Sequence, residues 1–74
     1  MESFDIPLEF VRKSIGRKVA VRLRNKVQIQ GRLSAYDDHL NMMIEDATLS
    51  KEGTSQFKNL IYLRGDMIVL VGKS

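Results

Sequence analysis

Two short stretches hold the side chains best able to do chemistry: the run from Asp37 to Asn41, and the triplet Arg64-Gly65-Asp66. The carboxylates of Asp37 and Asp66, with the imidazole of His39, could form a metal or general-base cluster in an enzyme that cleaves phosphodiesters. This set offers few metal ligands or catalytic bases, because His39 is the only histidine and the chain has no cysteine. We therefore expect a binding protein with no catalytic residue, metal or cofactor.

The same residues also have structural uses. Asp37 and Asn41 are of the types that form Asx turns between strands. His39 is of a type common on exposed loops, and Arg64 can form an ion pair with Asp66 or with Asp37. The surrounding elements decide between these uses, because they set how close the two stretches come.

The triplet Arg64-Gly65-Asp66 separates two runs, 57–64 and 67–71, whose β-branched, aromatic and apolar residues favour strands. Because Gly65 permits a sharp bend, the triplet predicts a corner between two strands. Successive positions from Leu60 to Leu63 and from Met67 to Val71 are apolar, so both faces of each strand require burial. A neighbouring subunit can provide it, and so can a helix and an opposing sheet of the same chain. The residues expected at a subunit interface are Leu60, Tyr62, Met67, Ile68, Val69, Leu70 and Met43.

The elements before this corner follow from hydrophobic spacing. Apolar residues at helical intervals predict a helix over about 5–15, with Asp5 able to cap its start and Gly16 to end it. Alternating patterns predict strands over about 18–24, 27–36 and 40–48, with Gly31 marking a bend or a close backbone approach. The longest loop is expected within 47–56. The chain thus predicts a single domain, 1–74, that is mostly β: a helix followed by five bent antiparallel strands in a small open barrel.

Charge is unevenly distributed along the chain. Residues 1–32 hold eight of the twelve Lys and Arg against three acids, a net of +5, and the remainder carries −2. This bias suits a polyanion such as nucleic acid, although a merely solvated surface could carry the same charges. The chain has no apolar run long enough to span a membrane, and its acidic N-terminus is unlike a secretory signal. We therefore expect an intracellular protein with no membrane partner.

A family resemblance rests on both polar stretches. The run from Gly31 to Ile44 resembles the first Sm motif, and Leu63 to Leu70 resembles the second. Asp-x-x-x-Asn followed by Arg-Gly-Asp within a strand is a specific pairing, so the chain is identified as resembling the Sm-like (LSm) family. Its first motif is similar to that of the third subunit of the eukaryotic LSm heptamer. As a compact chain of 74 residues, it also resembles archaeal Sm-like proteins, which form homomeric rings.

The resemblance implies a ring, a heptamer of Sm-like subunits, in which the strand before the corner of one subunit joins the strand after it in the next. Its ligand would be uridine-rich single-stranded RNA. His39 and Arg64 would stack on a base, and Asn41 would read the uracil edge. Asp37 would orient Asn41, while Gly65 and Asp66 would complete the pocket floor.

The biological role implied by the resemblance depends on the organism. In a eukaryote it would be pre-mRNA splicing through the 3′ end of a small nuclear RNA, together with mRNA decay, in nucleus and cytoplasm. In an archaeon it would be a cytoplasmic homomeric ring that acts as a general RNA chaperone. A ring that binds only proteins is a further possibility.

Overall fold

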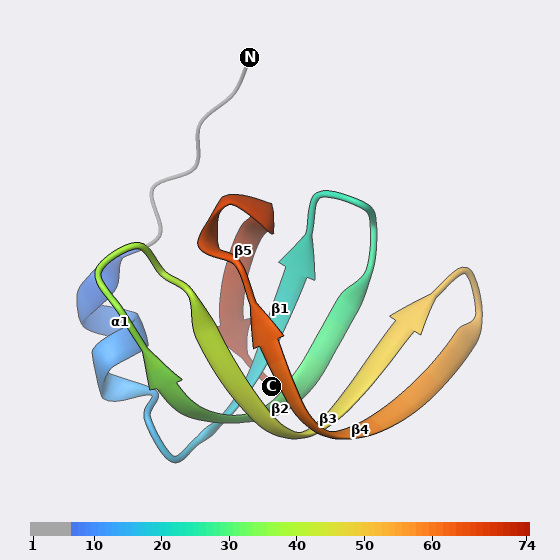
Figure 1. Cartoon of the computed structure of the whole chain (residues 1–74), viewed down its shortest axis with the longest axis horizontal. Coiled ribbons are helices and arrows are strands. Elements are labelled where there is room, and N and C mark those ends of the chain that lie inside the picture. Colours follow the sequence, from blue (N-terminus) through green and yellow to red (C-terminus); the bar gives the residue numbers. More distant parts are fainter. Residues whose placement is uncertain (1–6) are drawn as a thin grey trace.

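A computed structural model describes residues 7–74 (Figure 1). The elements in chain order are α1 (Leu8–Lys13), β1 (Lys18–Leu23), β2 (Gln28–Tyr36), β3 (Met42–Lys51), β4 (Thr54–Leu63), the 3-10 helix η1 (Gly65–Met67) and β5 (Ile68–Lys73). The predicted fold class, one helix followed by five strands, is confirmed.

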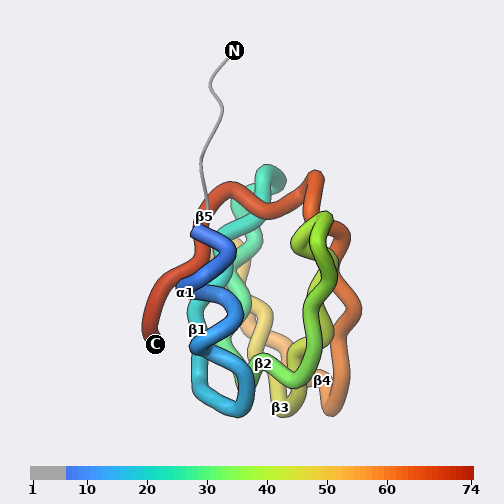
Figure 2. Tube along the Cα trace, turned by 90° about the vertical axis from the view of Figure 1, so that its left-hand side faces the viewer, coloured from blue at the N-terminus to red at the C-terminus, as the bar shows by residue number. Residues whose placement is uncertain are grey.

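The five strands form one antiparallel sheet in the order β4-β3-β2-β1-β5. β2, β3 and β4 curve strongly, so the sheet curls around an interior, as seen from the front in Figure 1 and from the side in Figure 2. The sheet does not close, because β4 and β5 lie at its ends and each pairs with one strand only. Two strand edges are therefore left free in the single chain.

The core lies on the inner face of this curled sheet. Alternation on β1 and β2 buries Val19, Val21, Ile29 and Leu33 at 0–1% exposure, and Val11 of α1 joins the same cluster. The segment after α1 is fixed to β2 by a hydrogen bond of 2.8 Å from the Gly16 N–H to the Leu33 carbonyl.

Gly31 has the close backbone approach that its position in the sequence predicted. A Cβ atom at Gly31 would lie 2.6 Å from Cγ2 of Ile44 and 2.8 Å from the Glu45 carbonyl oxygen. Since no side chain fits at such distances, glycine allows β3 to fold tightly across β2.

The helix is shorter than predicted. It ends at Lys13, and Ser14, whose hydroxyl donates to the Phe10 carbonyl at 2.8 Å, opens the turn that follows. Gly16 has φ +80°, the left-handed conformation expected where a helix ends. The helix also begins later than predicted, at Leu8, because Pro7 before it is extended. Asp5, the predicted cap, lies outside the described residues.

The prediction of a long loop within 47–56 is wrong. β3 continues to Lys51 and β4 begins at Thr54, so only Glu52 and Gly53 connect them. Their φ angles of +51° and +81° are those of a two-residue hairpin turn whose twist matches the strands. The pairing of β3 with β4 therefore extends to Lys51 and Thr54.

Other strand limits also differ from the prediction by one or two residues, and β5 continues to Lys73. β3 begins at Met42 rather than at Leu40, because Leu40 has φ +63° and lies in a turn that its N–H closes on the Asp37 carbonyl at 3.0 Å. After the corner, η1 occupies Gly65–Met67, so β5 starts at Ile68.

Candidate functional site

The loop between β2 and β3 is organised by the carboxylate of Asp37. One oxygen, Oδ1, accepts the backbone N–H of His39 at 2.9 Å and that of Asn41 at 3.0 Å. The bond to His39 closes an Asx turn, so this structural use of Asp37 is present. Because the Asp37 N–H also donates to the Asn41 carbonyl at 3.1 Å, the whole loop is fixed from its first residue.

The side chain of Asn41 joins this loop to the corner after β4. Its Nδ2 donates to Oδ2 of Asp37 at 2.9 Å, and its Oδ1 accepts the backbone N–H of Gly65 at 2.7 Å. The expected hydrogen bond by which Asp37 orients Asn41 is therefore present. An amide has two N–H donors and two acceptor lone pairs, so one donor and one lone pair of Asn41 remain for a ligand.

Glycine is required at position 65 because another part of the backbone lies close to it, and not because of its backbone angles. A Cβ atom at this position would lie 1.8 Å from the carbonyl oxygen of His39. The φ angle of Gly65 is not positive, so other residues could also adopt this bend. The two polar stretches of the sequence thus meet backbone to backbone, which a side chain would prevent.

The charged groups here have defined electrostatic partners. The hydrogen bond donated by the Asn41 side chain is the main cause that lowers the pKa of Asp37. Desolvation opposes it, and the backbone N–H groups of Asn41 and His39 lower the pKa further. Arg64 forms an ion pair with Asp66, with Nη2 of the guanidinium and Oδ2 of the carboxylate separated by 3.2 Å. Because these side chains are 74% and 66% exposed, the pair contributes little stability and leaves the guanidinium accessible.

Five of the six predicted RNA-binding residues line one shallow hollow of about 580 Å³: His39, Asn41, Arg64, Gly65 and Asp66. Asp37 lies behind Asn41 and lines an adjoining hollow with Met43. Both hollows are also lined by Tyr62, which sequence reasoning assigned only to an interface. Its position two residues before Arg64, on the same side of one strand, was the available signal.

Arg24 is a second residue that sequence reasoning missed. Its Nε donates to the Asp66 carbonyl at 2.8 Å, and its backbone N–H donates to the Met67 carbonyl at 2.8 Å. Arg24 therefore fixes the corner from the end of β1. Nothing in the linear pattern connects it with a residue 42 positions away.

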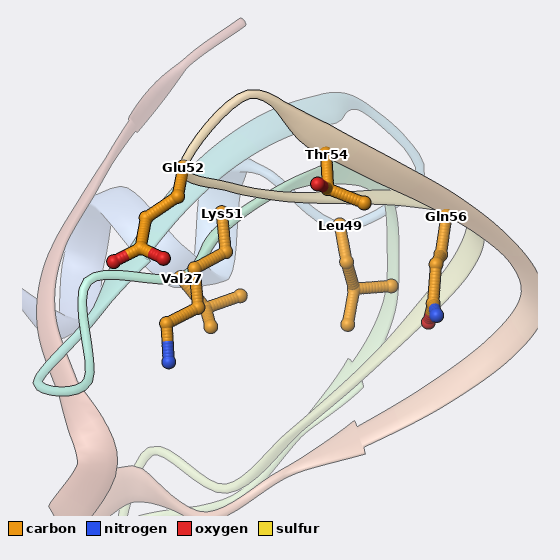
Figure 3. A pocket seen from close by; sticks show the side chains of 6 residues that line it. All are labelled: Val27, Leu49, Lys51, Glu52, Thr54 and Gln56. Atoms are coloured by element: carbon orange, nitrogen blue, oxygen red, sulfur yellow. The ribbon is translucent and has the colours of Figure 1, made fainter.

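A separate hollow contains none of the predicted site residues. It lies between the β1–β2 turn and the β3–β4 hairpin, and Figure 3 shows Val27, Leu49 and four polar neighbours around it. Within residues 7–74, no group of three or more His, Cys, Asp or Glu residues could hold a metal ion. No helix in that part of the chain is long and apolar enough to cross a membrane.

The predicted interface residues divide into three groups by exposure. Leu60, Tyr62 and Leu70, on the two edge strands, are 52%, 63% and 50% exposed. Ile68, at 5% exposure, belongs to the core of the chain itself, so its burial needs no neighbouring copy. The remaining members are partly buried: Met43, Met67 and Val69.

Comparison with known proteins gives consistent matches. The LSM domain family model matches residues 9–73. The "LSM complex subunit lsm3" of Schizosaccharomyces pombe is 37% identical over 88% of this chain and 85% of its own length. A heptameric archaeal Sm protein superposes with a TM-score of 0.83 at 29% identity, over 89% of this chain and 97% of that one. The Pyrococcus abyssii Sm protein in complex with a uridine heptamer superposes with a TM-score of 0.86 at 30% identity, over 95% of this chain and 100% of that one.

Proposed function

The chain belongs to the LSM domain family, and on this premise we propose that it binds uridine-rich single-stranded RNA as one subunit of a ring of Sm-like proteins. The observation that carries the proposal is the bridged amide of Asn41. It is held by Asp37 on one side and by the Gly65 backbone on the other, within a hollow that His39 and Arg64 also line.

This arrangement suits a uracil base. The free lone pair of Asn41 Oδ1 can accept from uracil N3–H, and the free N–H of Nδ2 can donate to O4. Cytosine presents the opposite pattern at these two positions. The imidazole of His39 and the planar guanidinium of Arg64 can lie against the faces of a base, which holds it without selecting it. The similar Pyrococcus abyssii structure, a complex with a uridine heptamer, supports this assignment.

Ring assembly follows from the two free edges of the sheet. β4 and β5 each offer unpaired backbone groups and exposed apolar residues, Leu60 and Leu70 among them. If β4 of one subunit paired with β5 of the next, both edges would be satisfied and the apolar side chains buried. The similar heptameric archaeal Sm protein supports seven subunits, either copies of this chain or other Sm-like chains.

The cellular role is the part of the proposal that depends on relatives. Similarity to an LSM complex subunit supports an intracellular protein, and a relative named as U6 snRNA-associated supports a role with a small nuclear RNA. For a eukaryote we propose the roles that the family resemblance implies, pre-mRNA splicing and mRNA decay, in nucleus and cytoplasm. Similarity to an archaeal Sm protein supports the alternative, a cytoplasmic homomeric ring that acts as an RNA chaperone.

We propose binding rather than catalysis for the polar cluster. The Asp37 carboxylate already accepts three N–H groups, and Asp66 is paired with Arg64, so both carboxylates have structural partners. Turnover of RNA by the purified protein in magnesium or zinc, abolished by His39→Ala, would contradict this part of the proposal.

The decisive experiment compares oligouridine with oligocytidine of equal length by fluorescence anisotropy across a salt series. The proposal expects tighter binding of oligouridine at every salt concentration, because edge recognition is independent of the phosphate contacts that salt weakens. Equal affinities throughout would show that the pocket does not read the base. A ring that binds only proteins would bind neither RNA.

A further inference from the structure

The region around β1 is the most basic part of the described chain. Between Ser14 and Tyr36 the sequence contains six Lys and Arg and no Asp or Glu. All six are exposed: Arg17, Lys18, Arg22, Arg24, Lys26 and Arg32. Such a stretch creates a positive field that only acids from other elements can reduce.

Strand register places two of these charges on the outer face of the sheet. Val19, Val21 and Leu23 are buried, so Lys18 and Arg22 on the opposite side of β1 face outward. Arg24 and Lys26 are also exposed, and they follow in the β1–β2 turn. We call Lys18, Arg22, Arg24 and Lys26 the basic stripe. At about 3.3 Å per strand residue, its part from Lys18 to Arg24 is roughly 20 Å long.

Acidic side chains neutralise positive charge at only one end of the outer face of β1 and β2. Arg32, opposite Lys18 in the register, forms ion pairs with Glu45 and Asp46 of β3. Among the described residues, no member of the basic stripe is in an ion pair. The stripe therefore carries uncompensated charge, with Arg32 marking its boundary.

The surface beside Arg22 mixes polar and apolar residues and has room for a ligand. Arg22 lies opposite Gln28 on β2 and Leu70 on β5, and Ala20 lies opposite Gly72. Because Ala20 and Gly72 carry little or no side chain, a hollow of about 150 Å³ forms next to Arg22. A ligand backbone can approach the guanidinium there, next to a neutral amide that can also form hydrogen bonds.

The basic stripe is continuous with the base pocket. Arg24 belongs to the stripe, and its Nε donates to the carbonyl of Asp66, which lines the pocket. We propose that the stripe binds the phosphate backbone of the same RNA strand whose base occupies the pocket, as an extension with no sequence preference. This inference rests on the proposed function, and it assigns the strand a path along the outer face of β1.

The test compares two double variants that remove equal charge. Lys18→Gln with Arg22→Gln neutralises the stripe, and Lys51→Gln with Lys58→Gln neutralises two lysines of the β3–β4 hairpin. Each is titrated with a short oligouridine and with the same oligouridine extended by a mixed-sequence tail. Circular dichroism and light scattering verify that fold and assembly are unchanged.

The stripe variant is expected to bind the extended RNA roughly tenfold more weakly at physiological salt, with a salt slope lower by about 1.4, because two phosphate contacts of about 0.7 each are lost. Its affinity for the short oligouridine and its preference over oligocytidine should be unchanged. Lys18→Arg with Arg22→Lys, which keeps both charges, should bind like the original chain.

Two outcomes would contradict the proposal that the basic stripe binds the RNA backbone. Equal weakening in both double variants would mean that only net charge matters, and no weakening in either would mean that the stripe lies off the RNA path. If the proposed base recognition by the pocket is wrong, the titrations give a different result. The unaltered chain would then bind oligouridine and oligocytidine equally, while the extended RNA still lost affinity in the stripe variant alone.

Discussion

At the scale of single residues, the Asn41 amide has two tasks, because it connects two loops and also presents hydrogen-bonding groups to the hollow. Asn41→Ala removes one base-edge contact per pocket, worth roughly 1–3 kcal/mol. In a ring of different subunits, one altered pocket should weaken oligouridine binding by about tenfold to a hundredfold. In a ring of identical copies the losses compound, and the preference over oligocytidine should nearly vanish. Anisotropy titration measures both.

Circular dichroism and particle size provide the control for Asn41→Ala. The substitution leaves the Gly65 N–H without its acceptor, but this group lies at a partly exposed corner, where water can replace the amide. If the variant unfolds or the ring dissociates, Asn41 is primarily a structural residue.

The carboxylate of Asp37 predicts a pH dependence. Its pKa is lowered in the folded chain, first by the Asn41 side chain and then by backbone N–H groups. A carboxylate with a depressed folded pKa stabilises the fold above its unfolded pKa of about 3.9, and this contribution is lost as pH falls through the folded value. NMR titration should therefore find Asp37 ionised below pH 3.9 and, in Asn41→Ala, shifted upward. An unchanged value in that variant would remove Asn41 as the main cause.

At the scale of elements, the contact between the two loops depends on Gly65. Gly65→Ala would place a Cβ atom 1.8 Å from the His39 carbonyl oxygen, so the loops must separate. Gly72→Ala is the matched control, because no atom lies within 4 Å of its Cβ position. Overpacking costs about 1–3 kcal/mol, and each kcal/mol lowers Tm by roughly 4–8 °C in a domain of this size. Thermal melts should show this loss for Gly65→Ala and little change for Gly72→Ala.

Failure of that prediction would also be informative. Equal Tm values for the two glycine variants would mean that the corner can move away from the loop at little cost. The Asn41 bridge would then not be a rigid part of the pocket.

The sequence predicted those elements whose signals are local and periodic. Alternation located β1 and β2, and the mid-strand position of Gly31 indicated the close approach that the structure contains. The hairpin at Glu52 and Gly53 was missed, because the polar residues around it are also typical of a long loop. Only the pairing of Lys51 with Thr54 shows that the strands continue to the turn.

The same distinction applies to the candidate site. The resemblance to the two Sm motifs implied one pocket containing Asp37, Asn41 and Gly65, and the structure contains the hydrogen bonds that join them. The contact of Arg24 with Asp66 was not predictable, because it depends on β5 crossing over to pair with β1. Long-range contacts of this kind depend on the topology of the sheet rather than on any local pattern.

At the scale of the whole molecule, the open sheet predicts that the isolated chain is not a stable monomer. β4 and β5 have unpaired edges, with Leu60, Tyr62 and Leu70 at least half exposed. Burying such residues at about 25 cal/mol per Å² of apolar surface favours association. Light scattering should find a ring-sized particle at micromolar concentration. A monodisperse 8.5 kDa species would contradict this expectation.

The pairing of β4 with β5 can be tested separately from ring size by placing one charge on each edge. Leu60→Asp damages β4 and leaves β5 intact, whereas Leu70→Asp does the reverse. In either variant alone every junction joins a damaged edge to an intact one, so each should sediment as a monomer. Mixed together, they can form one junction from two intact edges, β5 of the first with β4 of the second. The remaining two edges are both damaged, so the ring cannot close. Native mass spectrometry should therefore find a one-to-one dimer in the mixture, and a dimer in either variant alone would show that the subunits join through another surface.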